Sequence, residues 1–203
     1  MNLGNLNTMQ SPELPWWLVI SLRNHYRIME TFVETGTGIG ATSKIAATFF
    51  ERVFTVEIDP EMHRRAKENL RGVANVQQYK GDSAEILPHL MPNLSDKAIW
   101  WLDGHYSGGP KIGKVECPLL QEIEAINSAR PNNQDCILID NIGMMTKPPH
   151  QPHNPAEWPT IQMVVVTLQR NPKWSITRFC DVLIATPDPI IQTYNLRLSS
   201  LDI

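Results

Sequence analysis

The sequence predicts an α/β fold: one mostly parallel sheet of seven strands that ends in an antiparallel hairpin. From residue 31 onward, short apolar runs alternate with helical segments, which is the pattern of repeated βα units and favours a parallel sheet. The last two apolar runs are separated only by Cys180 and Asp181. Two residues can close a hairpin but cannot make the crossover that a parallel pair needs. A chain of 203 residues with 42 % hydrophobic content suits one folded core.

The first expected element is a helix. Ser11-Pro12-Glu13 resembles a helix N-terminus, and the apolar residues 16–22 would pack on the core or on a partner. Because this helix carries the aromatic pair Trp16-Trp17, it could form the interface of a homodimer. The apolar run is too short to span a bilayer and has no cationic stretch before it, so neither a membrane segment nor a targeting segment is expected.

The βα units follow in order along the chain. Strands are expected where the sequence is apolar and strand-like, at residues 31–34, 53–58, 76–79, 99–103 and 137–140. Helices are expected between them, at residues 41–50, 60–70, 83–90 and 119–129. A Pro-rich loop at residues 148–155 leads to a helix near residues 160–169 and to the hairpin strands at 174–179 and 182–185.

A glycine-rich turn joins the first strand to the helix after it, with the sequence Glu34-Thr35-Gly36-Thr37-Gly38-Ile39-Gly40. Glycines at such a turn let the backbone reverse and let a ligand approach it closely. The amide groups that open the next helix would attract polar ligand groups, and Glu34 adds an anionic acceptor beside them. The turn is therefore the expected centre of a ligand site.

Acidic residues follow the next two strands. Glu57 lies about twenty residues beyond the first glycine, where a carboxylate commonly holds ribose hydroxyls. Asp59 precedes Pro60 at a helix start and is expected to cap that helix. Asp82 could accept the exocyclic amine of adenine and Ser83 could contact the ring, while capping of the following helix would also explain Asp82.

Together these motifs resemble the class I S-adenosylmethionine-dependent methyltransferases: E-x-G-x-G-x-G from Glu34 to Gly40, then Val56-Glu57-Ile58-Asp59, then Gly81-Asp82-Ser83. The resemblance implies a Rossmann-like three-layer sandwich. Residues 1–29 would be an N-terminal helical extension, 30–187 the methyltransferase domain and 188–203 a tail. It also implies S-adenosylmethionine (SAM) as cofactor, held by Glu34, Thr35, Gly36, Thr37, Gly38, Gly40, Glu57, Asp82, Ser83 and Asp103.

Two other functions share parts of this pattern. An NAD(P)-dependent oxidoreductase would also fit, because Gly36-x-Gly38-x-x-Ala41 satisfies the looser dinucleotide fingerprint. Glu34 argues against it, since a dinucleotide pyrophosphate would meet like charge there, and so do Asp82-Ser83 and the terminal hairpin. The second alternative is a scaffold protein that binds SAM without catalysis, and the reactive side chains after the fourth strand argue against that.

The segment after the fourth strand holds the catalytic candidates, because ligands of open α/β sheets bind beyond the carboxyl ends of the strands. It reads Asp103-Gly104-His105-Tyr106-Ser107-Gly108-Gly109. Methyl transfer is an in-line displacement that needs a close, aligned nucleophile and, for a hydroxyl, a base. Asp103 and His105 are the expected catalytic residues, with His105 as general base; a structural histidine is the alternative.

A Mg²⁺ site is considered at the same edge of the sheet. Asp103 follows the fourth strand and Asp140-Asn141 follow the fifth, so three oxygen donors would meet there, as Mg²⁺ requires. This part resembles the metal-dependent sugar and catechol O-methyltransferases, which implies Asp103, Asp140 and Asn141 as ligands. Without an ion, the acids would contact the cofactor or cap the following loops.

Composition narrows the partners and the location. A net charge of -3 and a pI near 6.1 give no overall reason to bind nucleic acid, so a small-molecule or protein substrate fits more easily. The resemblance to sugar and catechol O-methyltransferases implies a small sugar-like or aromatic metabolite with an acceptor hydroxyl as the substrate. The three cysteines are far apart and are expected to be buried thiols in a reducing cytoplasm: Cys117, Cys136 and Cys180. The Pro-rich loop with His150, His153 and Trp158 could form a lid over the substrate or be simply exposed.

Overall fold

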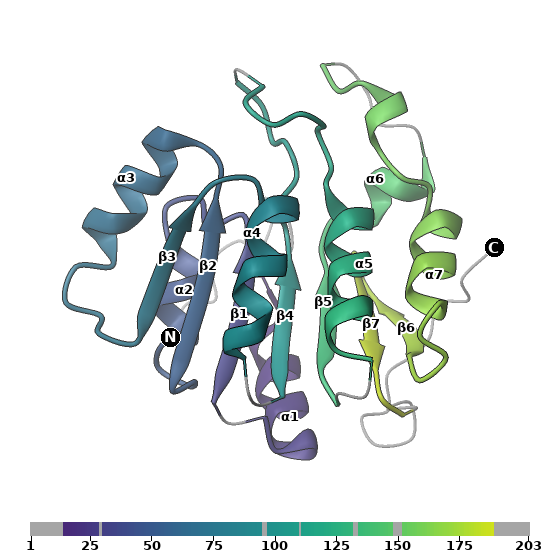
Figure 1. Ribbon diagram of the computed structural model, residues 1–203, viewed down its shortest axis with the longest axis horizontal. Helices are drawn as coiled ribbons and strands as arrows, with labels where there is room; N and C mark the ends of the chain where they lie inside the picture. The colour runs from purple at the N-terminus through teal and green to yellow at the C-terminus, as the bar shows by residue number, and fades with distance from the viewer. Residues whose placement is uncertain are drawn as a thin grey trace, which may run out of the picture.

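The computed structural model describes residues 14–28, 30–94, 97–109, 111–131, 134–147 and 152–188. The expected helix start at Ser11-Pro12-Glu13, His150 and nearly all of the expected tail lie outside these residues. Within them, the chain forms the expected mixed sheet with helices on both faces (Figure 1).

The sheet has seven strands in the order β3-β2-β1-β4-β5-β7-β6. Their bounds are β1 Thr31–Thr35, β2 Arg52–Glu57, β3 Val76–Lys80, β4 Ala98–Leu102, β5 Cys136–Ile139, β6 Ser175–Phe179 and β7 Val182–Thr186. The first five strands pair in parallel, and β7 runs antiparallel to both β5 and β6. The predicted terminal hairpin is confirmed: Phe179 pairs with Val182, and Cys180 takes a left-handed φ of 52° in the turn between them.

Helices cover both faces of the sheet, which makes the fold a three-layer sandwich (Figure 1). One face carries α4, α5 and α7, and the opposite face carries α1 and α2, while α3 flanks β3 at the end of the sheet. The bounds are α1 Trp16–Tyr26, α2 Ala41–Ala46, α3 Pro60–Asn69, α4 Ser83–Leu90, α5 Leu119–Ala129 and α7 Ile161–Gln169. These layers leave the ends of the parallel strands free to form a site.

Two adjacent tryptophans of β4 show how the sheet divides the core. Trp100 packs in the apolar layer under α4, α5 and α7, and Trp101 packs in the layer under α1 and α2. Successive residues of a strand face opposite sides of the sheet, so both rings are buried. The indole Nε1 of Trp100 donates to Oδ2 of Asp135 at 2.8 Å, which satisfies its one polar atom.

Three helical segments differ from the expected ones. α2 ends at Ala46 and not at residue 50, because residues 47–49 form a tighter turn in which Thr48 N donates to the Ile45 carbonyl. α1 continues to Tyr26, and Arg27 ends it in a left-handed conformation with a φ of 55°. A short helix that the sequence pattern did not reveal, α6 at Gly143–Thr146, follows β5.

The cysteines are free thiols, as expected, but one of them is not buried. Cys117 and Cys136 are buried, whereas Cys180 is exposed. The prediction of a third buried thiol was therefore wrong, because Cys180 lies at the tip of the β6–β7 hairpin, where the chain turns away from the core. In the part of the chain that the structure describes, no helix has the length and apolar character needed to cross a membrane.

Candidate functional site

A cavity of about 290 Å³ opens where β1, β2, β3 and β4 end, at the upper edge of the sheet in Figure 1. Six of the residues expected to hold a cofactor line this cavity: Gly36, Gly38, Glu57, Asp82, Ser83 and Asp103. The other four do not line it: Glu34, Thr35, Thr37 and Gly40. His105 also lines the cavity, so the expected cofactor residues and catalytic residues share one space.

The three glycines of the turn have positive φ values of 81°, 53° and 83°, and each is needed for a different reason. A Cβ on Gly36 would lie 2.2 Å from the carbonyl oxygen of Asp103, so only glycine fits where β1 and β4 end together. A Cβ on Gly40 would lie 2.9 Å from the side chain of Leu70. A Cβ on Gly38 would meet nothing within 4 Å, because Gly38 faces the cavity.

Glu57 joins the turn to the end of β2. Its Oε2 accepts a hydrogen bond from the backbone N of Gly38 at 2.8 Å, and its Oε1 accepts one from the backbone N of Asp59 at 2.8 Å. A carboxylate has room for further donors, so a ligand hydroxyl in the cavity can still bind it. The prediction that Asp59 caps α3 is confirmed, because its Oδ1 accepts from the backbone N of Glu61 at 2.7 Å.

Glu34 lies beneath the turn and not in the cavity. It is 1 % exposed and accepts hydrogen bonds from the hydroxyls of Ser43 and Thr55, the latter at 2.7 Å. Burial raises the pKa of the Glu34 carboxyl to about 8, although these hydroxyls lower it in part. Thr37 also points inward, with its hydroxyl 2.5 Å from that of Thr55. Both residues therefore support the turn from below.

Asp82 and Ser83 begin α4 at the wall of the cavity. Oδ1 of Asp82 accepts from the backbone N of Ala84 at 3.0 Å, so the capping role is confirmed. The same residue lines the cavity, and one carboxylate can cap a helix and accept a ligand amine at once. Ser83 is 6 % exposed and lines the cavity beside it.

Asp103 and His105 form a pair in the wall of the cavity. Nε2 of His105 lies 3.1 Å from Oδ1 of Asp103, and the histidine side chain is 14 % exposed. Burial lowers the pKa of the imidazole, but the hydrogen bond and charge of Asp103 outweigh it, so the pKa lies above its usual value. The carboxylate thus favours the protonated imidazole, as a base that accepts a substrate proton requires.

The other two expected metal ligands lie next to this pair. Nδ2 of Asn141 donates to Oδ2 of Asp140 at 2.9 Å and lies 3.1 Å from Nε2 of His105. Burial raises the pKa of Asp140 to about 7, and the charge of Asp103 adds to this. In the described ranges, no three His, Cys, Asp or Glu side chains are grouped so that they could hold a metal ion.

Solved structures share this arrangement of sheet and helices. PaMTH1 of Podospora anserina, a methyltransferase bound to S-adenosylhomocysteine (SAH), matches with a TM-score of 0.58 and 18 % identity over 85 % of this chain and 77 % of its own. An O-methyltransferase from Bacillus cereus in complex with SAH matches with a TM-score of 0.55 and 14 % identity over 88 % of this chain and 84 % of its own. The chain has the fold of class I methyltransferases.

A third match is SAM-bound CalS10 of Micromonospora echinaspora, an amino pentose methyltransferase. Its TM-score is 0.53 and its identity 12 %, over 85 % of this chain and 89 % of its own. Comparisons with protein-family models and with curated proteins find no match. The likeness to methyltransferases therefore lies in the fold.

Two buried acids beside the site of this methyltransferase fold were not among the residues predicted from the sequence. Glu116 is 5 % exposed and accepts hydrogen bonds from Nε1 of Trp158 at 2.7 Å and from the backbone N of Asn154 at 3.1 Å. Glu122 is 1 % exposed in the first turn of α5. Only Glu122 left a signal in the sequence, as a charge on the apolar stripe of a helix between Leu119 and Ile126.

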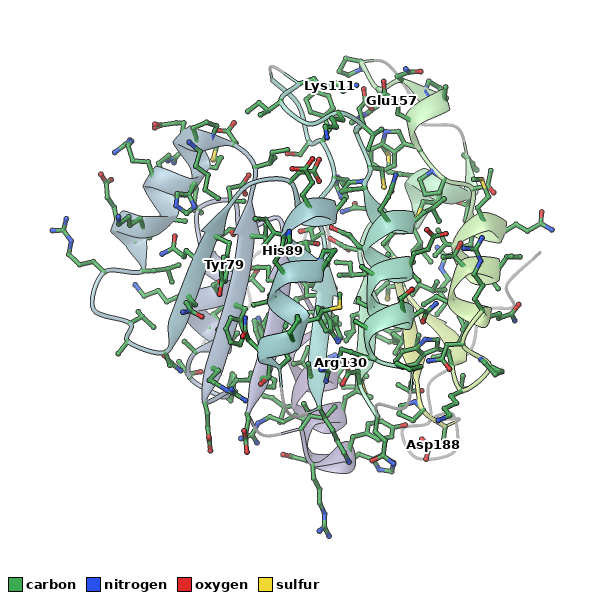
Figure 2. All side chains as sticks on the ribbon, viewed as in Figure 1. Tyr79, His89, Lys111, Arg130, Glu157 and Asp188 are labelled. Carbon is green, nitrogen blue, oxygen red and sulfur yellow. The ribbon has the colours of Figure 1, made fainter. Side chains whose placement is uncertain are left out.

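The loop after β4 is fastened on both sides of the cavity. Lys114 pairs with Glu85 of α4 at 2.6 Å, and Lys111 pairs with Glu157 of the segment before α7. Figure 2 shows Lys111 and Glu157 close together above the carboxyl ends of the strands. The segment that could form a lid thus touches the loop that carries His105.

Proposed function

We propose that the protein is a SAM-dependent methyltransferase that transfers a methyl group to a hydroxyl of a small sugar-like or aromatic metabolite. The observation that carries the proposal is the single cavity in which the glycine turn, Glu57, Asp82-Ser83 and the Asp103–His105 pair meet. Each of these groups suits one part of the reaction. The SAM- or SAH-bound methyltransferases of the same fold support the choice of cofactor.

The proposed position of SAM follows the chemistry of the cavity wall. The ribose hydroxyls would bind the carboxylate of Glu57, and the adenine would lie against Asp82 and Ser83. The amino acid part would lie over the open backbone at Gly38, where a Cβ would meet nothing within 4 Å. The sulfonium would then lie near Asp103, between these two ends.

The Asp103–His105 pair would take the proton from the hydroxyl of the acceptor. In the proposed reaction, an oxygen lone pair of the acceptor attacks the methyl carbon of SAM, and the carbon–sulfur bond breaks to leave neutral SAH. The hydroxyl proton passes to the Asp103–His105 pair, whose hydrogen bond stabilises the imidazolium. The rest of the rate enhancement would come from aligning the two reactants and from keeping water out of the site.

The expected Mg²⁺ remains a proposal beside this one. Two carboxylates and an amide are donors that Mg²⁺ accepts, and the buried Oδ1 of Asp140 has no hydrogen-bond partner among the described residues. A bound ion would lower the pKa of an acceptor hydroxyl. We favour deprotonation by His105, because His105 and the amide of Asn141 bridge the two carboxylates, Asp103 and Asp140.

Calorimetric titration with SAM, SAH and NADH tests the function. We expect both sulfur nucleosides to bind and NADH not to bind. Binding of NADH alone would support the oxidoreductase, and binding of SAM without methylation of any sugar or aromatic hydroxyl in a broad screen would support the scaffold protein.

Two glycine variants make this titration specific to the cavity. Gly38→Val would place a side chain in the space proposed for the cofactor and should abolish SAH binding. Gly72→Val is the matched control, because Gly72 has a φ of 84° and, like Gly38, open space around its Cβ position. Gly72 lies outside the cavity lining, so its variant should bind SAH normally.

We also propose a cytoplasmic location, a small-molecule substrate and no role in nucleic acid binding. The net charge of -3 and the free thiols support this setting. A homodimer through α1 is supported by Trp17, which is 49 % exposed and contacts Phe179 edge-on. Sedimentation of the wild type and of Trp17→Ser tests the dimer.

A further inference from the structure

Glu122 is a buried acid that the proposed reaction does not use. It lies in the first turn of α5 and is 1 % exposed. Among the residues that the structure describes, its Oε1 atom has no hydrogen-bond partner. A buried carboxylate without a compensating partner is costly, so a charge of opposite sign nearby would stabilise it.

A single glycine separates Glu122 from the main cavity. A Cβ on Gly104 would lie 3.0 Å from Oε1 of Glu122, so the carboxyl comes close only because Gly104 has no side chain. On its other side, the Cα of Gly104 would lie 3.2 Å from a Cβ on Gly36, and both glycines line the main cavity. Glu122 therefore lies directly behind the junction of Gly36 and Gly104.

This junction is where the sulfur of the cofactor would lie. The adenosine part is proposed at Glu57 and Ser83 and the amino acid part at Gly38, and the sulfur joins the two. In SAM this sulfur is a cation, and after methyl transfer it is a neutral thioether. A carboxylate behind the junction would attract the sulfonium of SAM but not the neutral thioether of SAH.

The other acids near the junction already have partners. Asp103 pairs with His105, and Oδ2 of Asp140 accepts from Asn141. Oε1 of Glu122 and Oδ1 of Asp140 have no hydrogen-bond partner among the described residues, and both acids line a small space of about 10 Å³ together with His105. Of these two acids, Glu122 is the one whose carboxyl lies against Gly104.

We propose that Glu122 is a specificity-determining residue that favours the sulfonium of SAM over the neutral SAH and so helps the product to leave. The inference rests on the proposed function, because it needs a SAM site in the main cavity. Without a charge behind Gly104, the site would have less means of distinguishing the sulfonium of SAM from the neutral sulfur of SAH. With it, loss of the positive charge weakens binding as soon as the methyl group has left.

The titration behaviour of Glu122 agrees with this role. Burial raises the pKa of its carboxyl to about 7, while the hydroxyls of Ser83 and Thr35 lower it in part. The charged groups that face it are Asp82, which raises this pKa, and His105, which lowers it. A sulfonium nearby would favour the ionised form further.

The test compares the affinities of SAM and SAH in matched variants. Glu122→Gln keeps the shape and removes the charge, and Glu122→Asp keeps the charge. Glu124→Gln is the control on the same helix, because Glu124 is 48 % exposed and pairs with Arg170. We expect the ratio of the SAH Kd to the SAM Kd to fall about threefold to tenfold in Glu122→Gln, the size expected of one charge several ångströms away.

The ratio distinguishes recognition of the charge from a structural role, because loss of a structural role would weaken the binding of SAM and SAH equally. An unchanged ratio in Glu122→Gln, or an equal fall in Glu124→Gln, would overturn the inference. If Glu122→Gln does not fold, the inference is tested with the wild type and sinefungin, an analogue in which a carbon bearing an amine replaces the methylated sulfur of SAM. Sinefungin should then bind more tightly than SAH, and equal or weaker binding would overturn the inference. Failure of the wild type to bind SAM and SAH at all would instead refute the proposed function.

Discussion

Trp158 and Glu116 are 42 residues apart in the chain, yet Nε1 of Trp158 donates a 2.7 Å hydrogen bond to Oε2 of Glu116. The bond ties the segment before α7 to the loop after β4. The carbonyl of Glu116 also accepts from the backbone N of Tyr106 at 2.7 Å, and the ring of Trp158 packs 5.2 Å from that of His105. The loop that carries His105 is thus held in place by Glu116 and Trp158.

Glu116→Ala should lower both stability and turnover. Removing the carboxylate leaves the indole of Trp158 and the backbone N of Asn154 without their acceptor, which costs about 1–3 kcal/mol. In a domain of this size that is a fall of roughly 2–12 °C in the melting temperature. Glu85→Ala is the control, because its ion pair with Lys114 is exposed and should change the melting curve little. Equal melting of the two variants would contradict the role of Glu116.

His105→Asn should slow methyl transfer without weakening SAH binding. A general base contributes about 10²- to 10⁴-fold, so kcat should fall by that order while the SAH Kd stays near the wild-type value. His89→Asn is the control, because His89 is exposed on α4, away from the cavity lining (Figure 2). A variant of His105 with wild-type kcat would leave this residue a structural role only.

Removal of divalent metal separates the two routes to deprotonation. If His105 takes the proton, dialysis against EDTA should leave the methylation rate unchanged, and added Mg²⁺ should not raise it. If EDTA abolishes turnover and Mg²⁺ restores it, the predicted ligands Asp103, Asp140 and Asn141 hold the ion, and the proposal for His105 is wrong. Methylation rates of one acceptor, measured after EDTA dialysis and again with added Mg²⁺, decide between the two routes.

Glu34 should make the fold less stable at high pH. Its pKa is raised to about 8 in the folded protein, so the folded state binds more protons than the unfolded state between about pH 4.5 and 8. The stability that this group contributes is full below about pH 4.5 and is lost as the pH rises through 8. Within this window the loss is up to about 1.4 kcal/mol per pH unit.

Melting curves of Glu34→Gln at pH 6 and pH 9 measure this effect. The variant should lose less stability between the two pH values than the wild type, because its amide does not ionise. Glu51→Gln, at an exposed position, should keep the wild-type difference. If Glu34→Gln and the wild type melt with the same pH dependence, Glu34 does not ionise on unfolding as its burial implies.

The sequence predicted the sheet and most of its helices because their signals are local. Strands such as β4 and β5 are buried along their whole length and appear as unbroken apolar runs. Helix starts at Asp59-Pro60 and Asp82 carry capping residues that the structure confirms. The hairpin followed from the length of one connection.

The sequence predicted less about the surroundings of each site residue, because these come from distant segments. Glu34 was expected to face the ligand, and nothing local shows that Ser43 and Thr55 draw its carboxyl beneath the turn. The contact of Glu116 with Trp158 joins two loops, whose geometry no periodic pattern encodes. The positions of these residues at strand ends predicted that they lie close together. Which of them line the cavity depends on side-chain packing, which the sequence pattern does not show.

A crystal structure with SAH tests the central claim most directly. The claim predicts the nucleoside in the cavity after β1 to β4, with the ribose on Glu57, the adenine at Asp82-Ser83 and the sulfur beside Gly104. A cavity that stays empty at saturating SAH, or SAH bound at another place on the protein, would contradict it.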